Sequence, residues 1–263
     1  MTAATFSDVL ASLAQVGDRF HVEPSEDWRQ GRTLFGGLSA CLAVRSAQRA
    51  FPQLPPLRSA QFAFIGPVTG ALFLTPILLR AGKSATFIQV EGKTETNTAL
   101  SATLVFGAAR RSSQSYCALP MPDAASPGAL PELIREPFAP RFSYQFETQI
   151  AGGAPPASGA ANPEFLAWLR HRDRSAPDDI TSIIALGDAT PPPALSMLTQ
   201  FPPISTMTWS IDLLSAKFSG PAWHLVRAES DIIGDGFCNQ RSVLWEASGA
   251  PIFVSRQTVA IFG

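Results

Sequence analysis

The chain has 263 residues, of which 46% are hydrophobic and only 16% are charged, and its formal net charge is −1. This length and apolar content are enough for one large domain or two of ordinary size. The near-neutral charge gives no general attraction to nucleic acid or to acidic membranes, so we expect neither as a partner.

Cysteine usage and the start of the chain indicate a soluble protein. The cysteines, Cys41, Cys117 and Cys238, show neither a disulfide framework nor the paired spacing of a metal site. Residues 1–20 lack the basic start and long apolar run of a signal peptide. No segment approaches the roughly 20 apolar residues of a membrane span. We therefore expect a cytoplasmic protein.

The first half begins with helical patterns. Apolar residues at helical spacing predict a short helix over Thr5–Val16, and a strand is predicted over Asp18–Val22. A second helix, rich in small and apolar residues, follows Gly36 and Gly37 and closes at Pro52. The two glycines allow close backbone approach, and the helix start offers N–H groups to an anion or a carbonyl oxygen. A tight packing turn is the simpler interpretation of the glycines.

Strand patterns complete the first half and indicate an antiparallel sheet. After a strand that contains Phe62 and Phe64, three more are predicted over Leu72–Leu79, Ala85–Glu91 and Ala99–Phe106. Pro76 predicts that its strand is an edge strand or is bulged. We therefore assign residues 1–110 to a first domain, residues 111–138 to a linker rich in Ser, Pro and Ala, and residues 139–263 to a second domain.

The second half repeats this order of helix and strands. Extended segments are predicted over Arg141–Gln149 and Phe165–Arg170, and a helix begins at Ile180. Four strands are predicted to follow it, over Ser205–Leu213, His224–Ile232, Cys238–Trp245 and Ile252–Phe262. The last strands of the two halves end alike, in Val-Phe-Gly and Ile-Phe-Gly, about 156 residues apart. A separation of that size indicates a tandem duplication rather than a solenoid, whose repeats span about 20–50 residues.

Asp188 stands out on the helix that begins at Ile180. Pro191–Pro193 cannot continue a regular helix, so Asp188 should lie in its last ordered turn, near buried surface. A carboxylate is disfavoured at a helix C-terminus by the helix dipole. The residue is therefore either a turn residue that bonds local backbone or a functional group.

A buried helix wrapped by an antiparallel sheet, present twice, resembles the double hotdog fold of the acyl-CoA thioesterase II family. The resemblance rests on motifs in both halves taken together: Phe35-Gly36-Gly37, Phe62–Pro67, Leu79–Ser84, Ala185–Asp188, Ser205–Ser210 and Phe253–Gln257. It implies an α+β fold made of two hotdog domains, each a long central helix wrapped by an antiparallel sheet. It also implies acyl-CoA as the substrate, no cofactor and no metal.

The resemblance implies three catalytic residues, Asp188, Thr206 and Gln257, which would hold and activate one water. Much of the family has an Asp-His-Ser run after the Thr, where this chain has Thr208-Trp209-Ser210. Thr208 is an alternative to Thr206, because residues two apart face the same side of a regular strand. The family's Arg before the Pro-Gly turn is Gly66 here.

The chemistry of thioester hydrolysis fits these residue types. A buried carboxylate is a suitable base, and a Thr hydroxyl and a Gln amide can orient the water. Backbone N–H groups at Gly36 and Gly37 are candidates for binding the oxyanion. Lys83 is a candidate for contact with a CoA phosphate, although a solvated lysine in a turn is the simpler interpretation.

Other catalytic chemistries find less support. There is no Gly-X-Ser-X-Gly nucleophile motif, and His21, His171 and His224 have no metal-ligand spacing. A Ser-His-Asp triad stays open, because triads are assembled in space. We expect an acyl-CoA thioesterase that pairs into a homodimer or a larger assembly through its sheet edges. The alternatives are a hotdog protein that binds acyl-CoA or another apolar ligand without hydrolysing it, and a hotdog dehydratase or hydratase.

Overall fold

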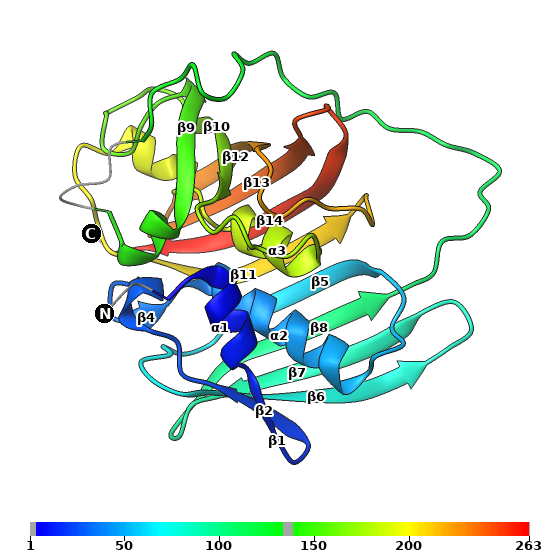
Figure 1. Ribbon diagram of the computed structural model, residues 1–263. Helices are drawn as coiled ribbons and strands as arrows, with labels where there is room; N and C mark the ends of the chain where they lie inside the picture. Colours follow the sequence, from blue (N-terminus) through cyan, green and yellow to red (C-terminus); the bar gives the residue numbers. More distant parts are fainter. Residues whose placement is uncertain (1–3, 134–138, 263) are drawn as a thin grey trace.

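The computed structural model describes residues 4–133 and 139–262, so the end of the predicted linker at 134–138 lies outside the described residues, as do 1–3 and 263 (Figure 1). The α-helices are α1 Phe6–Ser12, α2 Gly36–Ala50 and α3 Ile180–Gly187. Short 3-10 helices are η1 Glu26–Trp28, η2 Arg141–Gln145 and η3 Pro193–Met197. The strands of the first half are β1 Ala14–Val16, β2 Arg19–Val22, β3 Arg29–Gln30, β4 Thr33–Leu34, β5 Leu57–Phe64, β6 Leu72–Ala81, β7 Thr86–Lys93 and β8 Thr98–Phe106. Those of the second half are β9 Phe146–Gly153, β10 Glu164–His171, β11 Ile204–Leu213, β12 His224–Gly234, β13 Phe237–Glu246 and β14 Pro251–Ile261.

One antiparallel sheet runs through both halves of the described chain. Its twelve strands follow the order β1-β2-β6-β7-β8-β5-β11-β14-β13-β12-β10-β9. The order 6-7-8-5 of the first half is mirrored by 11-14-13-12 of the second, and the halves meet where β5 pairs with β11. Both strand meanders were predicted from the sequence, but their fusion into one sheet was not. The expected pairing between subunits stays a prediction.

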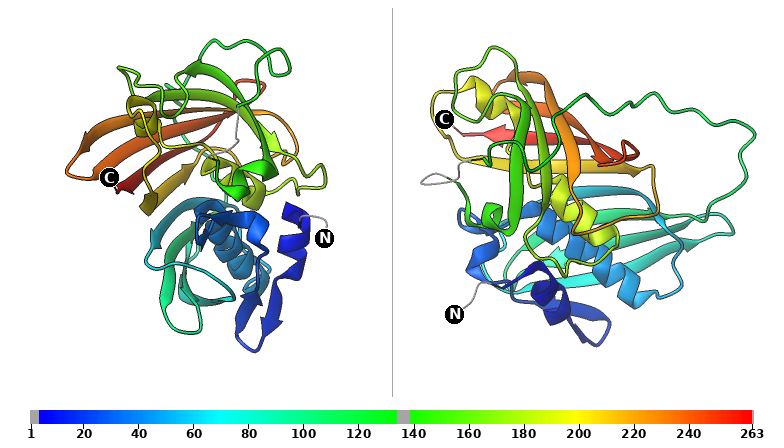
Figure 2. Two further views of the ribbon diagram at one scale, coloured as in Figure 1. Left: turned by 90° about the vertical axis from the view of Figure 1, so that its left-hand side faces the viewer. Right: turned by 45° about the horizontal axis from the view of Figure 1, so that its top comes forward.

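The strands curve around α2 and α3, which lie side by side between the two lobes (Figure 2). Small residues line α2 and let it pack closely, and ten of its residues are buried. All eight residues of α3 are buried as well. One apolar core therefore includes residues from both halves, with Phe62 of β5 and Trp209 of β11 in ring contact across the junction.

The two central helices differ in length, which corrects the expectation of a long helix in each half. α2 has 15 residues, whereas α3 has eight. α3 ends at Gly187, and Asp188 is its C-cap. The next regular element is the 3-10 helix η3, which begins at Pro193. The prolines after Thr190 explain the early end, because each lacks an N–H for the helix ladder.

Two further local predictions differ from the structure. Residues 141–145 form the 3-10 helix η2 instead of strand, because Ser143 bonds the carbonyl of Pro140 and Phe142 stacks on Phe35 at 4.0 Å. The predicted helix over Thr5–Val16 ends at Ser12, and β1 takes its last residues. Pro76 lies on β6 beyond the stretch that pairs with β2, so one side of the strand is unpaired there, as a proline requires.

The segment after β8 crosses the outside of the second half (Figure 1). Two tryptophans of the sheet fasten it there: Trp168 Nε1 donates to the carbonyl of Ala125 at 2.9 Å, and Trp245 Nε1 donates to that of Leu119 at 3.0 Å. This part of the predicted linker is therefore packed on the sheet. Residues 111–118 before it are exposed.

Candidate functional site

The start of α2 meets the end of α3 because the two helices run antiparallel. At one end, Arg45 of α2 forms a 2.6 Å ion pair with Asp179, the N-cap of α3. At the other end, Gly36 and Gly37 pack against Asp188. A Cβ on Gly36 would lie 2.9 Å from Asp188 Oδ2, and one on Gly37 would lie 2.9 Å from Asp188 Cβ. A side chain at Gly37 would therefore push the helices apart, whereas one at Gly36 would displace the carboxylate.

The carboxylate of Asp188 is held by two donors from different elements. Gln257 Nε2 on β14 donates to Oδ1 at 2.6 Å, and the backbone N–H of Gly37 also donates to the carboxylate. Asp188 is half-buried, so part of it stays accessible. Burial raises the pKa of Asp188 to about 7, although both hydrogen bonds act in the opposite direction. The carboxyl group can therefore exchange a proton near neutral pH.

Gln257 is itself held by a residue that the sequence did not single out. Gln240 on β13 lies directly across from Gln257, and its Nε2 donates to Gln257 Oε1 at 2.5 Å. Only 6% of Gln240 and 8% of Gln257 is exposed. The two strands were predicted but their register was not, and it is the register that pairs the two glutamines and places both on one face.

Thr206 lies on the same sheet face as Gln257, but Thr208 does not. Trp209 pairs with Gln257, Thr208 pairs with Thr258, and a bulge then shifts the register so that Thr206 pairs with Val259. Residues paired across an antiparallel sheet share a face, so Thr206 faces inward with Gln257 and Thr208 faces outward. The expectation that Thr206 and Thr208 share a face is wrong, because it assumed a regular strand. Within the described chain, Thr206 makes no hydrogen bond to Asp188 or Gln257.

The wall beside Asp188 is aromatic. Trp209 is 1% exposed, and a Cβ on Gly187 would lie 3.2 Å from its ring. Phe64 lies 3.5 Å from the Cβ position of Gly36. The carboxylate is thus bordered by apolar rings, which accounts for the strong effect of burial on its pKa.

Lys83 lies at the opposite end of the sheet from Asp188. It lies in the exposed turn between β6 and β7. Thr86, just after this turn, pairs with Phe106 of β8, and Phe106 pairs with Leu57 at the start of β5. Phe64, next to Gly36, is seven residues further along β5, about 23 Å at the usual rise of a strand. The structure therefore brings together Asp188, Gln257, Gly36 and Gly37, places Thr206 on the same face, and leaves Lys83 apart.

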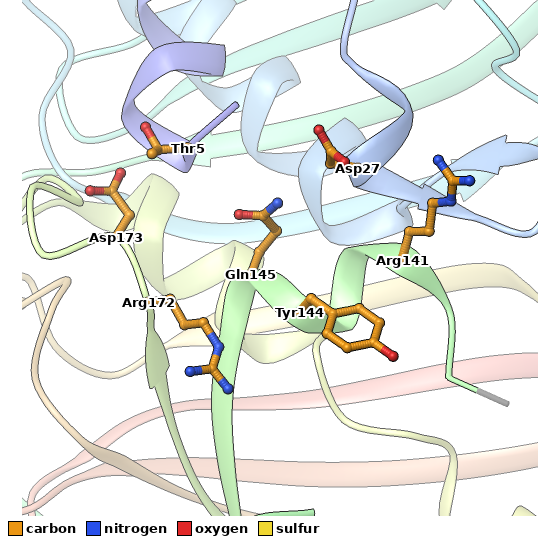
Figure 3. Close-up of a pocket in the computed structure, with 7 residues that line it drawn as sticks. All are labelled: Thr5, Asp27, Arg141, Tyr144, Gln145, Arg172 and Asp173. Carbon is orange, nitrogen blue, oxygen red and sulfur yellow. The ribbon is translucent and has the colours of Figure 1, made fainter. Parts of the chain in front are cut away.

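A hollow of about 510 Å³ lies between the two halves, and Asp188 is not among the residues that line it (Figure 3). Its lining is of mixed charge: Thr5, Asp27, Arg141, Tyr144, Gln145, Arg172 and Asp173. Both arginines are already paired, Arg141 with Glu26 and Arg172 with Glu132. None of the residues brought together around Asp188 lines this hollow.

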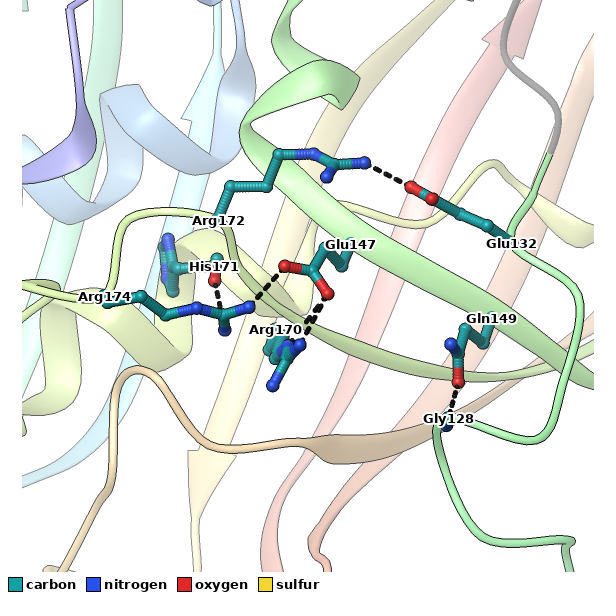
Figure 4. Close-up of polar contacts among 8 residues, drawn as sticks. All are labelled: Gly128, Glu132, Glu147, Gln149, Arg170, His171, Arg172 and Arg174. Atoms are coloured by element: carbon teal, nitrogen blue, oxygen red, sulfur yellow. Dashed lines mark hydrogen bonds and ion pairs between the residues drawn. The ribbon is translucent and has the colours of Figure 1, made fainter.

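The histidines that are buried do not join the site. His171 is packed between Phe6 and Phe146, and its Nε2 contacts the carbonyl of Ser182 at 3.0 Å. Burial lowers the pKa of His171 to about 4, and that of His224 to about 4 as well. Figure 4 shows His171 beside ion pairs of Glu147 with Arg170 and Arg174, which link β9 to β10 and the loop after it.

Two negative findings apply to the described part of the chain. No group of three or more His, Cys, Asp or Glu residues is placed to hold a metal ion there. In the same residues, no helix has the length and apolar character needed to cross a membrane.

Comparisons with solved structures show the fold. A protein of unknown function with hot dog fold from Alicyclobacillus acidocaldarius is 21% identical, with a TM-score of 0.87 and 97% of each chain covered. The tesB protein of Mycobacterium avium subsp. paratuberculosis is 17% identical, with a TM-score of 0.79 over 98% of this chain and 100% of that one. The acyl-CoA thioesterase II TesB2 from Mycobacterium marinum is 19% identical, with a TM-score of 0.77 and 97% of each chain covered. A comparison with curated protein sequences finds no match.

Family models cover most of the sequence. The model of the acyl-CoA thioesterase N-terminal domain matches residues 24–107, and that of the C-terminal domain matches residues 118–261. The second match alone spans more than half of the chain, and the residues between the two matches, 108–117, are exposed. The chain therefore belongs to the acyl-CoA thioesterase family and has a hotdog fold.

Proposed function

We propose that this protein hydrolyses acyl-CoA thioesters to a free acid and CoA, with Asp188 as the general base. The observation that carries the proposal is the carboxylate of Asp188, held by Gln257 and by the start of α2 in a chain of this family. A base works best when its pKa lies near the working pH, and burial raises the pKa of Asp188 to about 7.

The proposed reaction begins with water. Asp188 takes a proton from the water as its oxygen attacks the thioester carbonyl carbon, and the carbonyl electrons move to oxygen. Gln257 holds the carboxylate in place, and the Thr206 hydroxyl on the same face orients the water. The N–H of Gly36, in the first turn of α2, faces the developing oxyanion, while the N–H of Gly37 stays bonded to the carboxylate of Asp188. The carbonyl then re-forms, the C–S bond breaks, and the proton on Asp188 passes to the leaving sulfur.

We further propose that the two halves are two hotdog domains, residues 1–110 and 139–263, and that the first supplies Gly36 and Gly37 to a site whose base belongs to the second. The mirrored strand order and the two family matches support this division. Lys83 has no part in the proposed chemical step, because it lies at the far end of the sheet.

The test is thiol release from a panel of acyl-CoAs by wild type, Asp188→Asn and Asp188→Ala. We expect both variants to lose about 100-fold or more in kcat with little change in KM, because the base acts only in the transition state. Wild-type kcat/KM should rise with pH up to about 7, the pKa of Asp188, because the base must be ionised. Asp212→Asn is the matched control, since Asp212 is exposed on β11. Binding of acyl-CoA without turnover by wild type would instead make the protein a non-hydrolytic binder.

A further inference from the structure

Three side chains form a continuous hydrogen-bonded row beneath the site. Gln240 Nε2 donates to Gln257 Oε1 at 2.5 Å, and Gln257 Nε2 donates to Asp188 Oδ1 at 2.6 Å. We propose that Gln240 is a positioning residue that fixes the amide orientation of Gln257 and thereby favours the ionised carboxylate of Asp188. This inference rests on the proposed function, in which that carboxylate is the base.

The direction of the row follows from the chemistry of its end groups. An ionised carboxylate only accepts hydrogen bonds, so Gln257 must turn its NH₂ group toward Asp188 and its oxygen toward β13. Gln240 lies at that point because β13 and β14 pair Gln240 with Gln257. The thiol of Cys238 lies 3.9 Å from Gln240 Oε1, which matches the donor orientation of the Gln240 amide toward Gln257.

Burial gives this row its effect. Both glutamines are more than nine-tenths buried, so their dipoles act at low local dielectric, and successive hydrogen bonds polarise one another toward the carboxylate. Without Gln240, Oε1 of Gln257 loses its donor, and a buried acceptor without a donor is costly. The amide then gains by rotating its oxygen toward Asp188, where only a protonated carboxyl group can donate to it. Loss of Gln240 therefore favours the protonated form of Asp188.

No competing charge complicates this argument. The groups that face Asp188 from the neighbouring elements are uncharged: the N–H of Gly37 and the backbone of Gly36 on α2, the ring of Phe64 on β5 and the amide of Gln257 on β14. In the described part of the chain, no charged side chain contributes to the pKa shift of Asp188.

The experiment follows the ionisation of Asp188 directly. The side-chain carboxyl carbons of ¹³C-labelled aspartate are titrated by NMR in the full-length protein, and Asp188 is identified by the signal lost in Asp188→Asn. The variant is Gln240→Met, which keeps the size of the side chain but removes the donor. Gln240→Leu is the second variant, because it also removes the donor and introduces no charge near Asp188. The control is Ser242→Ala, which removes a part-buried 2.7 Å hydrogen bond to Ser255 on the same two strands.

We expect the midpoint of Asp188 to rise by about 0.5 pH units or more in both Gln240→Met and Gln240→Leu, and to stay unchanged in Ser242→Ala. The pH at which kcat/KM reaches half its maximum should rise in parallel. An unchanged midpoint in a folded Gln240 variant would overturn the inference even if wild type hydrolyses acyl-CoA. A raised midpoint in a protein that hydrolyses none would support the row of hydrogen bonds and reject only the proposed function.

Discussion

At the residue scale, opposing effects set the proton affinity of Asp188. Burial beside aromatic rings disfavours the charged carboxylate, while Gln257 and the N–H of Gly37 stabilise it. The positive end of the α2 dipole acts in the same direction as these two donors. Burial prevails, and the pKa of Asp188 becomes about 7 instead of the ordinary 3.8. A fully exposed carboxylate would be ionised but too weakly basic to activate water efficiently.

The bulge in β11 places Thr206 and Thr208 on opposite faces of the sheet, so a variant of one is a control for the same variant of the other. Thr206→Val should lower kcat by about tenfold or more, because it removes a hydroxyl from the face that carries Gln257. Thr208→Val makes the same chemical change on the opposite face and should leave kcat unchanged. The measurement is steady-state thiol release by both variants and wild type.

The two variants also distinguish a catalytic role from a structural one. Valine is as well suited to a strand as threonine, so neither change should lower the midpoint of urea unfolding appreciably. Equal kcat values for Thr206→Val and Thr208→Val would exclude the Thr206 hydroxyl from the reaction.

Local sequence predicts some of these residues and leaves others hidden. Three prolines place Asp188 at the end of a helix, and paired glycines mark the start of another. Gln240 has no local signature, because its role depends on the register between β13 and β14. The opposite orientations of Thr206 and Thr208 depend on a bulge that strand propensity does not reveal.

At the scale of elements, the site exists because the start of one helix meets the end of another. Gly36→Ala tests this contact, since its Cβ would lie 2.9 Å from Asp188 Oδ2. Alanine improves helix propensity by up to about 1 kcal/mol, so the variant should keep near wild-type stability. The carboxylate must move to make room, however, and we expect kcat to fall by about tenfold or more. Thiol release and urea unfolding measured together separate the two effects.

Gly70→Ala provides the control, because nothing lies within 4 Å of its Cβ position. This variant should match wild type in both measurements. Full activity in Gly36→Ala would mean that the position of Oδ2 next to α2 has no part in the reaction.

Element boundaries follow the sequence where one strong local signal acts. Proline ends α3, and alternating patterns locate β6, β7 and β8. The strand expected at Arg141 becomes η2 instead, because stacking of Phe142 on Phe35, more than 100 residues away in sequence, holds that turn. Long-range packing of this kind cannot be read from alternation alone.

At the scale of the whole molecule, the halves share too much to be independent. β5 and β11 make the sheet continuous, α2 packs on α3, and the apolar core includes both halves. Each half alone would expose the backbone of a long central strand and the buried face of its helix. Such an edge favours aggregation over folding as a monomer.

A cut in the exposed segment 111–117 tests this dependence without removing a contact of the core. The segment after it stays fastened to the second half by Trp245 and Trp168. With a protease site inserted there, the cleaved protein should elute as one complex and keep the proposed thioesterase activity, because the β5 and β11 pairing holds the fragments together. The fragments separated in urea should aggregate when refolded alone and recover activity when refolded together. The expectation would be contradicted if the fragments separated without denaturant and each refolded as a monomer. The shared sheet would then not be needed for folding, and the contact of α2 with Asp188 would depend on a weak association of two independent domains.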